Sequence, residues 1–265
     1  MQHPIKAARA DIPREELASQ AAAVLARLRA KSPRVHCITN SVAQNFTANA
    51  LLALGAVPSM TLSPEEIGAF VARSDALLVN LGTFDRERRE ATAIAVDAAT
   101  QSGRPWVLDP VFVDRAPGRA AYARDLVVLA PKAIRLNAAE FTALAESEPS
   151  RDAVAAYAQM RRTVIGLSGA TDLIADGERI ATIANGHALM ARVTAMGCAA
   201  SSIVAACLAV EPDALRATSS AMLIVGVAGE MAAKNAKGPG SFAAAILDAL
   251  YNIDAHTLAD KARAE

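Results

Sequence analysis

Cysteine is scarce in this 265-residue chain, and the few cysteines present exclude two classes of protein. Cys37, Cys198 and Cys207 are an odd number and form no Cys-x-x-Cys pair, and the four histidines do not cluster with them in sequence. The chain therefore predicts neither a disulfide framework nor a zinc site. This use of cysteine is typical of a reducing compartment, so we expect a cytoplasmic protein.

An excess of either charge and a long apolar run are also absent. Lys plus Arg and Asp plus Glu both number 27, so no overall field favours nucleic acid or an anionic membrane. No uncharged apolar run is long enough to cross a bilayer, and the polar first sixteen residues lack the apolar region of a signal peptide. We expect a soluble, unexported protein without a nucleic-acid or membrane partner.

Two phosphate-binding signatures are missing as well. No Gly-x-Gly-x-x-Gly follows the first predicted strand, and no Gly-x-x-x-x-Gly-Lys-Ser/Thr occurs, which excludes a Rossmann dinucleotide site and a Walker loop. No internal repeat, low-complexity tract or change in composition marks a linker. With 53% hydrophobic residues the chain can bury a full core, so residues 1–265 are predicted to form a single domain.

Short apolar segments alternate with helical patterns along most of the chain. This alternation predicts an α/β fold with a mainly parallel central sheet and helices on both faces. Residues 13–30 have apolar residues at helical spacing, so residues 1–33 are expected to contribute a helix packed on the domain. A hairpin is expected to turn at Asp176–Gly177. The predicted strands are residues 34–38, 56–60, 76–84, 105–110 and 163–169, and residues 126–137 are expected to contain a helix end and another short strand.

Polar side chains follow several of these strands, at the edge where open α/β sheets bind ligands. Asn40 lies in an amide-rich segment that either orients a ligand or caps the next helix. Asp109 is a candidate for binding magnesium, although a turn-forming Asp-Pro pair explains it equally well. Glu140 either closes a capping box with Asn137 or holds magnesium near phosphates, and the spacing does not decide between them.

Residues 193–206 predict a loop that turns abruptly into a buried helix of small residues. The first amides of a helix lack intrahelical partners and carry partial positive charge, so the helix start beside Gly197 suits a phosphate. The same field is expected to lower the pKa of Cys198 and make it a base or nucleophile. A small, buried hydrophobic residue is the alternative interpretation of Cys198.

Seven segments of the chain, spanning roughly residues 34–254, resemble the hydroxyethylthiazole kinase family in their order and approximate spacing. This is a thiamine-salvage family with a ribokinase-like fold. The resemblance implies ATP-dependent phosphorylation of 4-methyl-5-(2-hydroxyethyl)thiazole on its hydroxyl, with Mg²⁺, by a homotrimer whose thiazole sites lie between subunits. The segments are ITNSVAQNFTANALLALGAVPSM, VNLGTF, LDPV, IRLNAAE, SGATDLIADG, VTAMGC and GPGSF.

The resemblance also implies roles on the substrate side of the site. Met60 is expected to pack on the thiazole, and Asn40 and Ala195 to line the same pocket. The segment Ala195–Gly197 would form an anion hole for the transferred phosphate. Cys198 occupies the position of the catalytic base in the wider ribokinase-like group.

On the nucleotide side, the resemblance implies a second set of residues. Arg135, Asn137 and Ser168 resemble the positions that bind ATP. Asp109 and Glu140 resemble the acidic positions near Mg²⁺ and the phosphates.

Three departures from the family pattern leave the substrate open. Ala195 and Met196 replace the first two residues of Gly-Thr-Gly-Cys, Leu136 replaces a glycine, and the bulky Phe112 begins a segment that usually contains glycine. We expect these changes to favour negative φ in each loop or to shift the substrate. Two alternatives are a kinase of another small primary alcohol, such as hydroxymethylpyrimidine, and a catalytically weak ligand-binding relative.

Overall fold

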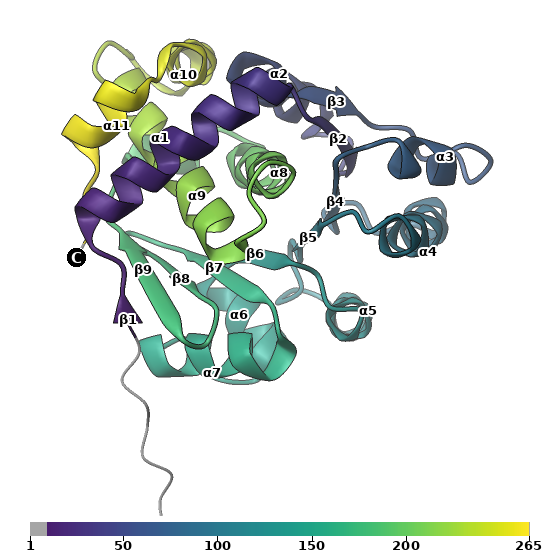
Figure 1. Ribbon diagram of the computed structural model, residues 1–265. Coiled ribbons are helices and arrows are strands. Elements are labelled where there is room, and N and C mark those ends of the chain that lie inside the picture. Colours follow the sequence, from purple (N-terminus) through teal and green to yellow (C-terminus); the bar gives the residue numbers. More distant parts are fainter. Residues whose placement is uncertain (1–9, 265) are drawn as a thin grey trace, which may run out of the picture.

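The computed structural model describes residues 10–264, so the prediction for the first nine residues lies outside the described part of the chain. One nine-stranded sheet lies between two layers of helices (Figure 1). Its strand order is β1-β9-β8-β7-β6-β5-β4-β2-β3, and only the β7–β8 and β8–β9 pairs are antiparallel. The strands are β1 (Ala10–Asp11), β2 (Arg34–Ile38), β3 (Val57–Ser59), β4 (Ala76–Asn80), β5 (Trp106–Asp109), β6 (Ala133–Asn137), β7 (Val164–Ser168), β8 (Asp172–Ala175) and β9 (Arg179–Ile183).

Helices cover both faces of the sheet, as predicted (Figure 1). One face is covered by α2 (Gln44–Leu54), α8 (Met196–Leu208) and α9 (Ala214–Ala233). Three further helices pack against α9: α1 (Arg14–Lys31), α10 (Pro239–Asn252) and α11 (Ala255–Lys261). The other face carries α3 (Ile67–Ala72), α4 (Arg86–Gln101), α5 (Pro117–Val128), α6 (Ala138–Ala145) and α7 (Arg151–Arg161). A short 3₁₀ helix, η1 (Ala188–Arg192), precedes α8.

Local sequence signals explain several element ends. Helix α2 ends at Gly55, whose φ of 105° is the left-handed conformation that a residue without Cβ adopts at little cost. The hairpin between β8 and β9 turns at Asp176 and Gly177 as predicted, with Gly177 at φ 102°. Helix α6 begins at a capping box made by Asn137 and Glu140.

Two local features differ from the sequence prediction. Ser63 is a typical helix cap and Pro64 suits the first helical position, so the sequence predicts a helix from there to Arg73. Helix α3 instead begins at Ile67, because residues 64–66 form a turn in which the Ser63 carbonyl accepts the Ile67 amide at 2.9 Å. Strand β1 was not predicted, because its two residues pair with Arg179 and Ile180 of β9 without any hydrophobic alternation of their own.

The parallel register gathers the carboxyl ends of the strands at one edge. Asn80 at the end of β4 is paired with Asp109 at the end of β5, and Asn137 of β6 is paired with Ser168 of β7. Helix α8 begins beside the same edge, since the Cys198 thiol accepts a hydrogen bond from Asn80. The fold therefore places a helix start against a row of polar strand ends.

Candidate active site

Asn80, Asp109 and Cys198 form a buried hydrogen-bonded group. The Nδ2 of Asn80 donates to Oδ2 of Asp109 at 2.7 Å and to Sγ of Cys198 at 3.2 Å. Asn40 donates to the same sulfur, also at 3.2 Å. The structure thus brings together three predicted site residues. Asn80 was missed as a site residue, and its place at a polar strand end was the only signal in the sequence.

The Cys198 thiol does not have the lowered pKa expected from its place at a helix start. Burial, and then the charge of Asp109, raise its pKa to about 11, although the two amide donors act in the opposite direction. Loss of hydration and a neighbouring carboxylate both disfavour a thiolate. Cys198 is therefore a neutral thiol at pH 7.

Helix α8 starts two residues earlier than Cys198, at Met196, with Ala195 as its N-cap. The first intrahelical bond runs from the Ala199 amide to the Ala195 carbonyl at 2.9 Å. The amides of Met196, Gly197 and Cys198 precede it and are the donors that a helix start offers to an anion.

At two of the three positions that depart from the family pattern, the backbone contradicts the expected negative φ. Ala195 has φ 70° and Phe112 has φ 60°, so both residues have a left-handed backbone conformation. An L-residue there costs about 1–2 kcal/mol. The loops keep a glycine-like path although the glycines are absent.

The third departure lies outside the site. Leu136 is a residue of β6 with no exposed surface, and its side chain packs in the core on the α4–α7 side of the sheet. Of the other two bulky residues, Met196 is buried, whereas the Phe112 side chain is 54% exposed.

Arg135 lies over the first turn of α8. Its Nη2 donates to Oγ of Ser168 at 2.8 Å, and a Cβ added at Gly197 would meet its Nη1 at 2.8 Å. The Nε of Arg135 is buried without a hydrogen-bond partner. An unpaired buried donor next to free helix amides is suited to an anionic ligand.

Asp109 and Glu140 form an acidic pair near this guanidinium. Burial raises the pKa of both, and the charge of Asp109 raises that of Glu140 further. Glu140 accepts the Asn137 amide at 2.9 Å and the Phe112 amide at 3.1 Å, so the capping interpretation of Glu140 and Asn137 is confirmed. The same carboxylates fit a divalent cation, since a cation would relieve their mutual repulsion.

The donor set suits Mg²⁺ better than a fully protein-bound metal. No group of three or more His, Cys, Asp or Glu that could hold a metal occurs in residues 10–264. Mg²⁺ is commonly bound by one or two carboxylates together with water and substrate phosphates. Asp109 and Glu140 are the residues that would hold it.

A cavity of about 540 Å³ opens beside Arg135 and Gly197. Its lining includes the polar side chains of Arg135, Ser168 and Asp172 and thioethers from α8 and α9. This volume is typical of small-molecule sites. The apolar lining residues include Met190, Met196, Met222 and Val225.

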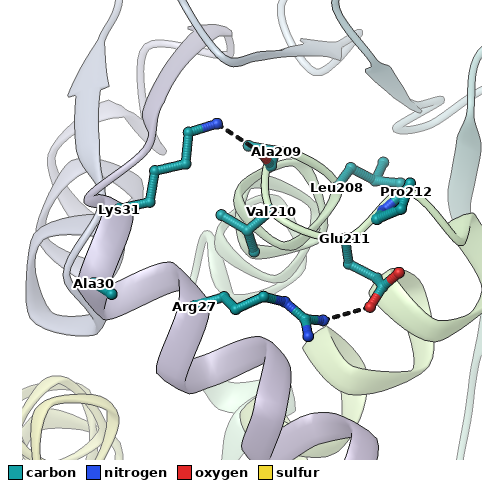
Figure 2. Close-up of a pocket in the computed structure, with 8 residues that line it drawn as sticks. All are labelled: Arg27, Ala30, Lys31, Leu208, Ala209, Val210, Glu211 and Pro212. Carbon is teal, nitrogen blue, oxygen red and sulfur yellow. Dashed lines mark hydrogen bonds and ion pairs between the residues drawn. The ribbon is translucent and has the colours of Figure 1, made fainter.

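A second cavity, of about 600 Å³, lies beside the carboxyl end of α8 and has no chemistry of this kind (Figure 2). Its two cationic side chains already have partners within the chain. Arg27 pairs with Glu211, and Lys31 donates to the Ala209 carbonyl at 2.9 Å (Figure 2). We interpret it as a gap between α1 and the α8–α9 connection.

Met60 lies at the carboxyl end of the edge strand β3 and is partly buried against the core. Its two neighbours in sequence are held by His36, whose Nδ1 lies 2.8 Å from Ser59 Oγ and whose Nε2 lies 3.1 Å from the Thr61 carbonyl. The adjacent strand β2 leads to Asn40. The predicted thiazole contacts Met60 and Asn40 therefore follow neighbouring strands.

The sheet, its helical layers and the helix start beside acidic strand ends define a ribokinase-like protein. A ribokinase-like superfamily protein from Enterococcus faecalis shares this fold, with a TM-score of 0.69 at 12% identity, over 94% of this chain and 98% of that one. No helix within residues 10–264 is both long and apolar enough to cross a membrane.

Sequence comparisons identify the family. The model of the hydroxyethylthiazole kinase family matches residues 25–256. A probable hydroxyethylthiazole kinase from Agrobacterium fabrum is 44% identical over 94% of this chain and 96% of its own length. A hydroxyethylthiazole kinase from Klebsiella pneumoniae is 46% identical over 84% of this chain and 92% of its own length. The structure of a hydroxyethylthiazole kinase protein from Pyrococcus horikoshii has a TM-score of 0.90 at 35% identity, and the match covers 93% of this chain and 98% of that one. The chain belongs to the hydroxyethylthiazole kinase family, and it is therefore a kinase.

Proposed function

We propose that this enzyme transfers the terminal phosphoryl group of ATP to the hydroxyl of 4-methyl-5-(2-hydroxyethyl)thiazole, as a step of thiamine biosynthesis or salvage, in the cytoplasm. The observation that supports this most is the position of Cys198, hydrogen-bonded to Asn40 and Asn80 in the first turn of α8, beside the Asp109 carboxylate. Family membership supplies the substrate class, since the relatives named above are hydroxyethylthiazole kinases.

The residues around α8 supply what phosphoryl transfer needs, which is alignment and positive charge more than covalent chemistry. The amides of Ala195–Gly197 and of Cys198 are the proposed anion hole. Arg135 adds a guanidinium beside these amides, and Ser168 accepts a hydrogen bond from it. Asn137 is proposed to bind ATP together with Arg135 and Ser168. Bound Mg²⁺ would neutralise phosphate charge, held by Asp109 and Glu140.

Cys198 is proposed to lie beside the alcohol and to accept its proton. Because its pKa is about 11, the thiol would first have to release its own proton to solvent, and the thiolate, although a strong base, is scarce at pH 7. In a loose transition state the alcohol proton leaves late, so the reaction needs little help from a base. Met60, Asn40 and Ala195 are proposed to hold the thiazole, and the adaptable thioether suits a small uncharged ring.

A homotrimer with thiazole sites between subunits is part of the proposal. Strand β3 is an edge of the sheet and leads directly to Met60. Val57 on β3 and Phe70 on α3 are 47% and 40% exposed, and both line a groove at this edge. An exposed edge strand with apolar neighbours is a surface suited to association with another chain.

A coupled ADP-release assay with ATP and Mg²⁺ tests the reaction, with hydroxyethylthiazole and hydroxymethylpyrimidine offered in parallel. Turnover of the thiazole alone is expected. Turnover of the pyrimidine alone would show that hydroxymethylpyrimidine is the substrate instead. Turnover of neither compound would support a ligand-binding relative.

Two substitutions of Cys198 test its role. If Cys198 accepts the proton, Cys198→Ser should lower kcat by about 100-fold, within the range that general-base catalysis contributes, and Cys198→Asp should retain much more activity. A Cys198→Ser enzyme with nearly unchanged kcat would leave Cys198 only a packing role.

A further inference from the structure

Arg119, in the first turn of α5, links the loops that follow two neighbouring strands. Its Nη1 donates to the carbonyls of Leu81, Gly82 and Val111, at 3.2 Å for Gly82 and 3.1 Å for Val111. Leu81 and Gly82 directly follow β4, and Val111 follows β5 by two residues. One guanidinium thus fixes the loops that begin beside Asn80 and Asp109.

The guanidinium is itself well fixed. Its carbon lies 5.3 Å from the centre of the Phe84 ring, a distance at which a cation is attracted to the ring face. Burial lowers the pKa of Arg119, but a guanidinium in a protein stays charged at neutral pH. A permanent, rigid donor therefore holds these carbonyls.

Gly82, whose carbonyl Arg119 holds, also contacts the side chain of Asn80. The Gly82 amide donates to Oδ1 of Asn80 at 3.0 Å, and Nδ2 of Asn40 donates to the same oxygen at 3.2 Å; a backbone N–H can only donate. Oδ1 must therefore face Gly82, and Nδ2 must face Asp109 and Cys198. The Gly82 backbone packs closely on both amides, because an added Cβ there would lie 2.6 Å from Nδ2 of Asn40 and 2.9 Å from Oδ1 of Asn80.

We propose that Arg119 is a positioning residue for the kinase reaction, acting through Gly82 to keep the Asn80 amide directed at Asp109 and Cys198. Without Arg119 the loop after β4 loses its bonds to this side chain, so the Gly82 amide is held less firmly against Oδ1 of Asn80 and the Asn80 amide is less firmly oriented. A turned amide would present Oδ1 to the Asp109 carboxylate, which is repulsive. The inference rests on the proposed function, since it takes Asp109 and Cys198 to be the reacting site.

The test compares Arg119→Met with Arg124→Met on the same helix. Arg124 donates to the Ala143 carbonyl at 3.2 Å and pairs with Glu146, so its loss removes a similar contact away from the site. Thermal unfolding tests whether each variant is folded. If Arg119→Met does not fold, Arg119→Lys takes its place in the kinetic comparison. Arg119→Met should lower kcat by about 10 to 100-fold, the effect of a small misplacement of reacting groups, with a smaller change in the KM for ATP. Arg119→Lys should recover part of the loss, and Arg124→Met should match the wild type.

A double-mutant cycle separates positioning from general structural support. If Arg119 acts through Asn80, then Arg119→Met should lower kcat by less than about 3-fold in an Asn80→Ala background. A full, additive loss in that background, or a wild-type-like Arg119→Met enzyme, would overturn the inference while the proposed function stands. A wild-type enzyme that phosphorylates neither alcohol would overturn both.

Discussion

A methyl group added at Gly197 would lie 2.8 Å from Nη1 of Arg135, the end of a flexible side chain. The fold can accommodate Gly197→Ala if the guanidinium moves, so we expect a Tm close to that of the wild type. The displaced Arg135 should bind the nucleotide less well, and the KM for ATP should rise about 10-fold, the loss of one charge-assisted hydrogen bond.

Gly226→Ala is the matched control for this prediction. Its added Cβ would lie 2.7 Å from the backbone oxygen of Asn185, which cannot rotate away. We expect it to lower the free energy of unfolding by about 1–3 kcal/mol. Equal loss of stability in both variants would contradict the distinction between a movable and a fixed neighbour.

Ala195 gives a prediction on stability. Its φ of 70° costs an L-residue about 1–2 kcal/mol, whereas glycine adopts it freely and loses roughly 0.5–1 kcal/mol in chain entropy. Ala195→Gly should therefore raise the free energy of unfolding by up to about 1 kcal/mol in urea titrations. Ala199→Gly, in the body of the same helix, should lower it by about 1 kcal/mol. A loss of stability in Ala195→Gly would argue against strain at this position.

Individual site residues were predictable where their chemistry shows in the sequence. Asp109 and Cys198 stand out because a carboxylate at a strand end and a thiol at a helix start are uncommon, whereas Arg135 was expected only from the family resemblance. The pKa of Cys198 was wrongly predicted, because burial and a carboxylate from another strand outweigh the helix field. Asn80 was missed as a site residue because a polar strand end does not reveal its partners, which depend on the register of β4 against β5.

At the scale of elements, the β2–β3 pair depends on a buried histidine. His36 has no exposed surface and contacts residues on both sides of Met60. Burial lowers its pKa below the ordinary histidine value of 6.5, so between these two pKa values the unfolded chain binds more protons than the folded one. Stability should therefore fall as the pH drops below about 6.5 and level off below the folded-state pKa.

His36→Gln tests this pH dependence. Glutamine does not titrate, so the variant should lose part of the decline in unfolding free energy between pH 7.5 and 5, measured by urea titration at each pH. One histidine contributes at most about 1.4 kcal/mol per pH unit. Identical pH profiles for variant and wild type would show that His36 does not contribute. We also expect a higher KM for the thiazole, because the Met60 segment loses its support.

Elements with a strong local signal were predictable, and those fixed by distant partners were not. The capping box of α6, the Gly55 end of α2 and the β8–β9 hairpin all follow from residues within a few positions of each other. The start of α3 was placed too early, since Ser63 and Pro64 form a turn rather than a helix cap. Strand β1 exists only because β9 offers it an edge.

At the scale of the whole molecule, the homotrimer that the family resemblance implies is proposed to use the exposed edge at β3. Light scattering should give three times the mass of one chain. Val57→Lys should reduce this to single chains and raise the KM for the thiazole, because a charged lysine on an edge strand opposes pairing. Val128→Lys, at the 72% exposed end of α5, should leave the mass unchanged. A wild-type monomer with full activity would exclude sites between subunits.

The pairing of strand ends has a consequence for how related chains can diverge in length. Arg135 and Ser168 are 33 residues apart in sequence, yet their contact depends only on the β6–β7 register. The intervening α6 and α7 lie on the face of the sheet opposite α8 and α9, so residues gained or lost there leave the contact between Arg135 and Ser168 in place. Relatives with a longer or shorter β6–β7 connection should keep the same pocket, and an alignment of such sequences should be anchored at the strand ends rather than at constant spacing.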